Sequence, residues 1–337
     1  MFGISIVLKD THKPSTTISN LTIILTELSK PSAYLYRIIS RHKAEILNPL
    51  YMMFKLLGVL FFIISFTSCA VKKHADISYL NTPELKIKTD GEIPKLNVFN
   101  SRNISEENKS VKKPVLIFVY GGNWNTGSKD IYGFLGRNFV KHDVVSVLPN
   151  YTLSPQANYD TMARQIAEAI KWTQNNIADY GGDPSRIYLT GHSAGGHLVA
   201  LATLNPKYGI DPASISGIIL NDAAALDMKH YLENNPPTTT DDYLTTWTNE
   251  PAKWQDASPV YFLSKTSPPF KIYLGSKTYQ SIKTANARFL EELHNFQPAV
   301  QPQILKKKHV PMVLQYFWPW SKRYDEIVAF MGVVKKN

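Results

Sequence analysis

The stretch Arg186-Ile-Tyr-Leu-Thr-Gly-His-Ser-Ala-Gly-Gly-His197 decides how the rest of the chain is interpreted. It begins as a short apolar run typical of a strand, and residues 197–204 continue it with the composition of a helix. A serine on so sharp a turn between strand and helix, here Ser193, has a strained backbone and an outward-pointing hydroxyl. Glycines two residues before and after it avoid collisions with neighbouring elements. The pattern predicts that Ser193 is a nucleophile and favours hydrolysis as the chemistry.

A second glycine motif, Tyr120-Gly-Gly-Asn-Trp-Asn-Thr-Gly127, follows the apolar run at residues 114–120. Attack by a serine creates negative charge on a substrate oxygen, and backbone N–H groups stabilise that charge. Adjacent glycines let such groups point into a cleft without obstruction. We therefore predict an oxyanion hole formed by Gly121 or Gly122 together with Ala194.

An attacking serine also needs a base to accept its proton. The chain order typical of this arrangement is serine, acid, histidine, so the base is expected after the last strand. Of the nine histidines, His309 alone follows a final expected strand and precedes a terminal helix. We predict that His309 is the base, and that the lysines at 306–308 favour its neutral form if they lie near enough.

The acid that orients the base is expected soon after the strand at 270–274, but residues 275–281 contain no carboxylate. Asp222 lies directly after the preceding strand, at the carboxyl edge where α/β sheets place catalytic groups. We predict that Asp222 is the acid. Asp227, which a helix N-cap also explains, Asp256, Thr278 and no acid at all remain as alternatives.

Strands alternate with helices along most of the chain, which predicts an α/β fold with a mainly parallel sheet and helices on both faces. Weak alternation at 85–89 and 95–99 predicts an antiparallel edge hairpin. Residues 228–258 interrupt the rhythm and are predicted to form a cap over the site, with a plain surface excursion as the alternative. Strands are expected at 114–120, 144–148, 186–190, 215–220, 270–274 and 302–305, and helices at 162–177, 197–204, about 282–295 and about 322–335.

An apolar run of eleven residues, 56–66, follows Lys55 and precedes Thr67-Ser68-Cys69. It is shorter than the roughly 20 residues of a membrane-spanning helix and resembles a bacterial lipoprotein signal, in which the cysteine is diacylated. We predict a signal at 52–68, lipidation of Cys69, and a lipid-anchored protein of the cell envelope, periplasmic or outer-membrane-associated. Residues 69–84 are then a tether and 85–337 the catalytic domain. Residues 1–51 are predicted to be an upstream extension outside the working protein, with a genuine extension as the alternative.

The net charge of +10 is spread along the chain, with no basic stripe interleaved with aromatic residues. This distribution argues against nucleic-acid binding. The single cysteine excludes an intrachain disulfide. Nothing in the sequence implies a metal or a cofactor.

From about residue 95 to its end the chain resembles the esterase/lipase branch of the α/β-hydrolase fold. The group that it resembles holds kynurenine-formamidase-like, hormone-sensitive-lipase-like and feruloyl/acetyl-xylan-esterase-like enzymes. The resemblance implies Ser193 as nucleophile and His309 as base, with two departures: Tyr120 stands in place of a histidine and Thr278 in place of an aspartate. The residues that carry it are Tyr120-Gly-Gly-Asn-Trp124, Asn150-Tyr-Thr-Leu-Ser-Pro155, Tyr180-Gly-Gly-Asp-Pro-Ser-Arg186, Gly191-His-Ser-Ala-Gly-Gly-His-Leu198, Ala257-Ser-Pro259 and His309.

The sequence therefore predicts a serine hydrolase that cleaves a small carboxylic ester through an acyl-enzyme. An amide or formamide substrate is an alternative within enzymes. A catalytically weak or silent hydrolase fold acting as a binding module is the alternative outside them, motivated by Thr278. The predicted partners are a small ester substrate and, through the lipid anchor, a membrane.

Overall fold

The computed structural model describes residues 71–88, 91–102, 111–238 and 243–333. The chain divides into two units, residues 1–68 and Cys69–Asn337, and every described residue belongs to the second. The predicted extension, signal segment and lipidation site lie outside the described residues. Within the described part, no helix has both the length and the apolar character needed to cross a membrane.

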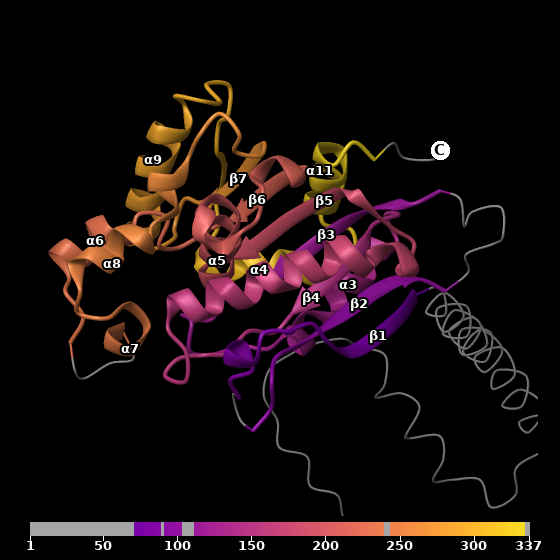
Figure 1. Ribbon diagram of the computed structural model, residues 1–337. Helices are drawn as coiled ribbons and strands as arrows, with labels where there is room; N and C mark the ends of the chain where they lie inside the picture. Colours follow the sequence, from indigo (N-terminus) through magenta and orange to yellow (C-terminus); the bar gives the residue numbers. More distant parts are fainter. Residues whose placement is uncertain (1–70, 89–90, 103–110, 239–242, 334–337) are drawn as a thin grey trace, which may run out of the picture. The chain divides into compact units, whose positions relative to one another are not determined.

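An eight-stranded sheet forms the centre of the described unit, with the strand order β1-β2-β4-β3-β5-β6-β7-β8 (Figure 1). β2 pairs antiparallel with β1 and β4, whereas all pairs from β4 to β8 are parallel. The predicted α/β architecture is thereby confirmed. The strands are β1 (Val71–Ser78), β2 (Lys95–Ser101), β3 (Lys113–Val119), β4 (Val145–Pro149), β5 (Gly182–His192), β6 (Gly217–Asn221), β7 (Phe270–Gly275) and β8 (Gln303–Leu305).

Helices cover both faces of this sheet. Tyr188 of β5 points toward one face, where its ring lies 6.1 Å from that of Phe330 in α11. On the same face α3 and α11 contact each other, since Asn138 Nδ2 donates to the Tyr324 hydroxyl at 3.2 Å. The helices are α3 (Gly133–Val140), α4 (Tyr159–Asn176), α5 (Ala194–Leu204), α6 (Met228–Asn234), α7 (Tyr243–Trp247), α8 (Pro251–Asp256), α9 (Gln280–Leu293), α10 (His309–Leu314) and α11 (Lys322–Phe330).

The opposite face carries α4, α5 and α9. The end of α4 lies over the Val115 side of β3, since a Cβ atom added to Gly182 would meet the side chains of both Val115 and Ile177. All eleven residues of α5 are buried. A helix enclosed on every side needs an apolar surface all round, which the alanines, leucines and valine of α5 supply. Because α5 is enclosed in this way, its first turn, which directly follows Ser193, has a fixed position.

The edge of the sheet differs from the prediction in two respects. Residues 71–78, expected within a tether, form the antiparallel edge strand β1. Residues 85–88 form no strand; Leu85 ends a short 3-10 turn, and its carbonyl accepts a hydrogen bond from the buried amide of Gln165 at 2.7 Å. Edge strands commonly carry charged residues that discourage further pairing, so the lysine-rich β1 has the composition of a linker.

The described residues of the segment 228–258 form the three short helices α6, α7 and α8, which lie together at the left of Figure 1. Trp247 of α7 is fully buried and stacks on Tyr159 of α4, with ring centroids 5.7 Å apart. The Thr246 hydroxyl also donates to Ser154 Oγ at 2.9 Å. The helix α7 is therefore packed into the fold, and the cap role of the segment stays a prediction.

Candidate active site

The residues of the site follow the carboxyl ends of five parallel strands. Gly121 follows β3, Ser193 follows β5, and Asp222 follows β6. Thr278 comes three residues after β7, and His309 four residues after β8. Because the carboxyl ends of parallel strands meet at one edge of a sheet, segments far apart in sequence converge there.

The turn between β5 and α5 has the geometry that the glycine pattern predicts. Ser193 has φ 55° and ψ −122°, a combination that L-residues rarely adopt. A Cβ atom on Gly191 would lie 2.3 Å from the Gly195 carbonyl carbon, and one on Gly195 would lie 2.1 Å from the Val119 oxygen. Only glycine therefore permits this close approach of the turn to β3.

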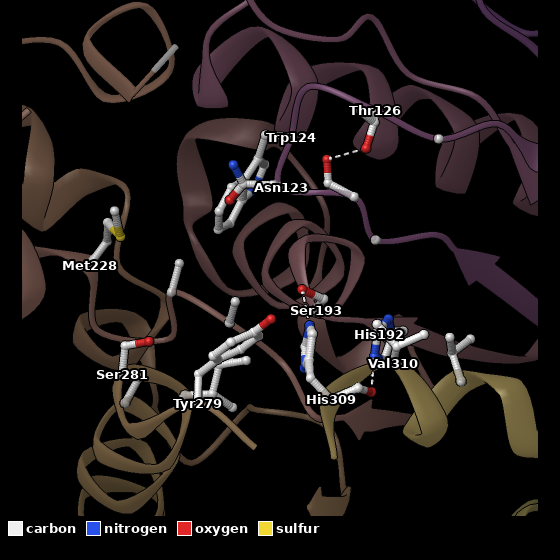
Figure 2. A pocket seen from close by; sticks show the side chains of 18 of the residues that line it. Asn123, Trp124, Thr126, His192, Ser193, Met228, Tyr279, Ser281, His309 and Val310 are labelled. Carbon is white, nitrogen blue, oxygen red and sulfur yellow. Dashed lines mark hydrogen bonds between the residues drawn. The ribbon is translucent and has the colours of Figure 1, made fainter. Parts of the chain in front are cut away.

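Ser193, His309 and Asp222 form a continuous chain of hydrogen bonds, and Figure 2 shows its first link, between Ser193 and His309. The Ser193 hydroxyl lies 2.8 Å from His309 Nε2, and His309 Nδ1 lies 2.6 Å from Asp222 Oδ2. The carboxylate accepts, so these partners assign the proton of neutral His309 to Nδ1 and leave Nε2 to accept from the serine. The structure thus brings together the three residues that the sequence singled out.

Asp222 is fully buried, and each of its carboxylate oxygens has a partner. Oδ1 accepts from the Gly275 N–H at 2.8 Å, and Oδ2 accepts from the Thr278 hydroxyl at 2.5 Å as well as from His309. The Thr278 hydroxyl is also 3.4 Å from His309 Nδ1. Thr278 therefore contacts both residues and supplies a donor to the carboxylate, where the resemblance implied the carboxylate itself.

The other candidate acids have different partners. Asp227 accepts from the His230 N–H at 3.1 Å as the N-cap of α6 and pairs with Arg288 Nε at 2.6 Å. Asp256 forms an ion pair with Lys207. Neither carboxylate is hydrogen bonded to His309 in this structure, and the predicted N-cap role of Asp227 is confirmed.

His192, next to the serine, supports His309 from the other side. Its Nε2 lies 3.1 Å from the His309 carbonyl oxygen, and the two rings lie 4.6 Å apart. Burial, together with the nearby His309, lowers the pKa of His192 to about 3. His192 is therefore neutral at pH 7 and donates its Nε2–H to that carbonyl, which fixes the backbone at His309.

The glycine loop after β3 runs directly over the serine. A Cβ atom on Gly121 would lie 2.9 Å from the Ser193 Cβ and 2.7 Å from the His192 oxygen. Gly122 has φ 128°, and its carbonyl accepts from the Thr126 N–H at 2.9 Å and the Thr126 hydroxyl at 3.0 Å. The orientation of this peptide is thus fixed by the turn that follows it, as the dashed line at Thr126 in Figure 2 shows.

A buried aromatic cluster joins this loop to the cap. Trp124 lies 4.7 Å from Trp247, and its Nε1–H donates to His197 Nδ1 at 3.2 Å. His197 Nε2 in turn donates to the carbonyl of Ala257, directly after α8, at 2.8 Å. Burial lowers the pKa of His197 to about 4, so the neutral ring links the loop, α5 and the cap.

Tyr120, which replaces the expected histidine before the glycines, is buried beneath the loop. A Cβ atom on Gly127 would lie 2.6 Å from its ring, and the Tyr151 ring stacks on it at 4.7 Å. The Tyr151 hydroxyl donates to the Tyr120 carbonyl at 3.2 Å. Burial raises the pKa of Tyr120, so its hydroxyl stays neutral. The tyrosine therefore supports the loop from below by packing and hydrogen bonding.

A cavity of about 700 Å³ opens over Ser193 and His309. Figure 2 shows Tyr279, Ser281 and Met228 on one side and Asn123 and Trp124 across from them. The remaining lining is largely apolar and includes the cap tyrosines and residues of α9 and α10: Tyr231, Tyr243, Ile282, Ala285, Val310 and Val313. A cavity of this size accommodates a small organic molecule.

His192, Asp222 and His309 also form the one group of metal-ligand side chains found among the described residues, with ligand atoms within 4.8 Å of one another. His192 Nε2 is bonded to a carbonyl, and His309 Nδ1 to Asp222. The donor set is therefore already arranged as a hydrogen-bonded relay, and the expectation of no metal stays a prediction.

The fold, the turn at Ser193 and the histidine after the last strand define a protein of the α/β-hydrolase class. The BD-FAE family model matches residues 104–293, more than half of the chain. The chain belongs to this family.

Among curated relatives, the chain is 32% identical over 181 residues to esterase LipQ of Mycobacterium tuberculosis, covering 49% of this chain and 42% of that protein. It is 40% identical over 92 residues to the isoprenylcysteine alpha-carbonyl methylesterase ICME of Arabidopsis thaliana, covering 27% of this chain and 22% of that protein. The chain thus spans less than half the length of these relatives.

Solved esterase structures have the same fold. A truncated carbohydrate esterase from gut microbiota gives a TM-score of 0.62 at 17% identity, covering 78% of this chain and 98% of that one. Esterase 2 of Thermogutta terrifontis, phosphoramylated by tabun, gives 0.56 at 17% identity, covering 74% and 94%. At these identities the likeness establishes the fold alone.

Sequence reasoning did not identify the contacts that hold the site in place. The link from Trp124 through His197 to Ala257 joins residues 73 and 60 positions apart in the chain. The only local signal for it was the tryptophan after the paired glycines. The hydrogen bond from the Thr278 hydroxyl to Asp222 is a second contact of this kind. The sequence showed only that position 278 lacks the aspartate that the resemblance implies.

We expect the buried neutral histidines to make folding sensitive to acid. Unfolded histidine titrates near pH 6.5, whereas the pKa of His197 is about 4, so the unfolded chain binds more protons between these values. This contribution to stability is complete above pH 6.5 and is lost as the pH falls toward 4. The free energy of unfolding should fall by about 2 kcal/mol per such histidine between pH 7 and 5, measured by urea denaturation.

The variant His197→Gln should reduce this dependence on pH. Thr203→Ala is the matched control, because it also removes a buried hydrogen bond of α5 but no titrating group. It should lower stability at every pH and leave the slope as in the parent. An unchanged slope in His197→Gln would contradict the assignment.

Proposed function

We propose that the protein is a serine hydrolase that cleaves a small carboxylic ester through an acyl-enzyme. The observation that carries this proposal is the chain of hydrogen bonds from Ser193 Oγ through His309 to Asp222, with distances of 2.8 and 2.6 Å. The esterase names of the relatives support the same chemistry. The hydrogen-bonded chain supplies a nucleophile, a base within reach of its proton and a carboxylate behind the base.

In the first half-reaction Ser193 Oγ attacks the ester carbonyl carbon while its proton moves to His309 Nε2. Asp222 stabilises the imidazolium that forms, and the Thr278 hydroxyl and Gly275 N–H keep the carboxylate in place. The tetrahedral intermediate collapses, the bond to the alcohol breaks, and His309 returns the proton to the leaving oxygen. The acyl group then remains on Ser193.

In the second half-reaction a water molecule replaces the alcohol. His309 accepts its proton, the hydroxide attacks the acyl carbon, and the carboxylic acid leaves as Ser193 regains its proton. Both tetrahedral intermediates carry negative charge on the former carbonyl oxygen. In this proposal the N–H groups of Gly121 or Gly122 and of Ala194 donate to that oxygen. Each such donor typically contributes a factor of about 10²–10³ in rate.

The lining of the cavity supports an ester with a compact, mainly apolar body. Ala224, Ala225, Met228 and Ala285 leave room beside Ser193 on the cap and α9 side. Hydroxyl groups are provided by Tyr279, Ser281 and the cap tyrosines. We propose that this side receives the acyl group, because it lies next to Ser193 and is enclosed by two elements.

We also propose that Cys69 carries a lipid that anchors the protein in the cell envelope. The apolar run at 56–66 and the small residues before Cys69 support this, and the second structural unit begins at Cys69. The mass of the N-terminal peptide from native protein tests the anchor; an unmodified Cys69 within a longer peptide would refute it.

The intact protein should react with a fluorophosphonate probe, because an activated serine attacks phosphorus as it attacks an acyl carbon. Ser193→Ala should abolish both labelling and hydrolysis of p-nitrophenyl acetate and butyrate. The exposed Ser276→Ala is a control that should retain both. Failure of the intact protein to react would favour the binding-module alternative.

Asp222→Asn should lower kcat/KM by about 10³–10⁴, because the amide no longer stabilises the imidazolium or selects the tautomer. The double variant Asp222→Asn/Thr278→Asp returns a carboxylate next to His309 Nδ1, from which the Thr278 hydroxyl is 3.4 Å away. It should recover about tenfold of the lost rate.

Asp256→Asn is the matched carboxylate control, since Asp256 pairs with Lys207 and not with His309. It should change kcat/KM only slightly. Full activity in Asp222→Asn would exclude Asp222 as the acid, whatever the result for Ser193.

A further inference from the structure

A cluster of large apolar side chains is exposed beside the site, between α10 and α11. We call this cluster the aromatic ridge; it consists of Leu314, Phe317, Trp318 and Trp320. Trp320 is 75% exposed, and Phe317 and Trp318 are each more than half exposed. The rings adjoin one another, with centroids 5.4 Å apart for Phe317 and Trp318 and 5.2 Å for Trp318 and Trp320. A contiguous exposed patch of this kind marks an interaction surface.

The ridge is held by buried contacts beneath it. Tyr316 is buried, and its carbonyl accepts a hydrogen bond from the Tyr324 hydroxyl of α11. The Ser321 N–H donates to the Trp318 carbonyl at 3.0 Å and closes the turn that carries both tryptophans. The fold therefore presents these rings to solvent on a fixed turn.

Lysines lie beside the ridge. Residues 293–324 contain five Lys and Arg and no Asp or Glu, and Asp325 and Glu326 follow them. Lys307 and Lys322 line a hollow of about 420 Å³ together with Trp318 and Trp320. Arg323 is paired with Glu326, whereas within the described part of the chain the lysines at 306–308 and 322 form no ion pair. The surface thus combines exposed indole rings with lysines that pair with none of the described acids.

The ridge is continuous with the mouth of the cavity. Val310 lines the cavity next to His309, as Figure 2 shows, and Leu314 follows one turn later on α10. On the other side Phe317 lies 5.4 Å from Phe134, which adjoins the cavity residue Tyr132 at 6.1 Å. A partner that covers the ridge therefore lies at the entrance to the site.

We propose that the aromatic ridge docks on an anionic phospholipid surface and places the cavity mouth at the lipid interface. Tryptophan is favoured at membrane interfaces, where its ring is apolar and its N–H meets water. Lysines near the surface add attraction to anionic headgroups. A neutral polysaccharide would use the rings but not the charge, and a second copy of this basic surface would be repelled. The charge thus selects the anionic bilayer.

Quenching of tryptophan fluorescence by brominated lipids tests this proposal in the full chain. Of its six tryptophans, Trp124, Trp247 and Trp254 are buried, Trp172 of α4 is half-buried, Trp318 and Trp320 belong to the ridge, and the apolar run at 56–66 contains none. Vesicles containing brominated phosphatidylglycerol should quench part of the emission of the parent. Trp318→Phe/Trp320→Phe should remove that part while the thermal unfolding midpoint stays unchanged. The experiment measures only binding to vesicles, so its result does not depend on the proposed catalysis.

Charge-reversal variants distinguish the effect of the lysines beside the ridge from the effect of the net charge of the protein. Lys307→Glu/Lys322→Glu should weaken partitioning onto phosphatidylglycerol vesicles by about tenfold at low salt. Lys112→Glu/Lys265→Glu is the matched control, because it makes the same change in net charge at exposed positions elsewhere. It should have a much smaller effect, since salt screens distant charges.

Three outcomes would overturn the proposal. Equal quenching of the parent and the tryptophan variant would show that the ridge does not enter the bilayer. Equal effects of the two lysine pairs would show that only net charge matters. A response of the tryptophan emission to a neutral oligosaccharide, or to self-association, without any response to anionic vesicles would assign the ridge to another partner.

Discussion

The described structure depends on the contact between the turn after β5 and the end of β3. Gly195 approaches the Val119 carbonyl so closely that a methyl group there would lie 2.1 Å from it. This contact sets α5 against the sheet and forces Ser193 into its left-handed conformation. The Ser193 N–H then reaches the Asn221 carbonyl at 3.3 Å, next to Asp222. One steric constraint thus aligns the ends of three neighbouring strands.

The loop over the site depends on a second, polar constraint. A protonated His197 would present two N–H donors, one of them facing the Trp124 N–H. Burial keeps the ring neutral, so Nδ1 accepts from Trp124 while Nε2 donates to Ala257. The loop, α5 and the cap are therefore all connected through the neutral His197 ring. A change in any one of them alters the hydrogen bonds of this ring and so affects the other two.

The local signals in the sequence were sufficient for much of this arrangement. The glycine spacing around Ser193 reports a steric requirement that few other turns impose, and Asp222 directly follows a buried strand. The edge strand β1 was missed because its lysines resemble a linker. The edge-to-face contact of Trp247 with Trp124 was missed because it joins segments more than 100 residues apart and has no local periodicity. Contacts of this kind depend on the assembled fold.

The conformation of Asp222 restricts how the site can evolve. Its φ of 52° is tolerated by Gly, Asn and Asp far better than by other residues, and of these only Asp carries charge. A second carboxylate at position 278 would lie against the first and compete with it for the same proton. In the proposed mechanism, moving the acid from position 222 to 278 by single mutations therefore passes through a sequence with two acids or with none. Thr278 avoids this competition, because its hydroxyl donates to Asp222 and adds no second charge.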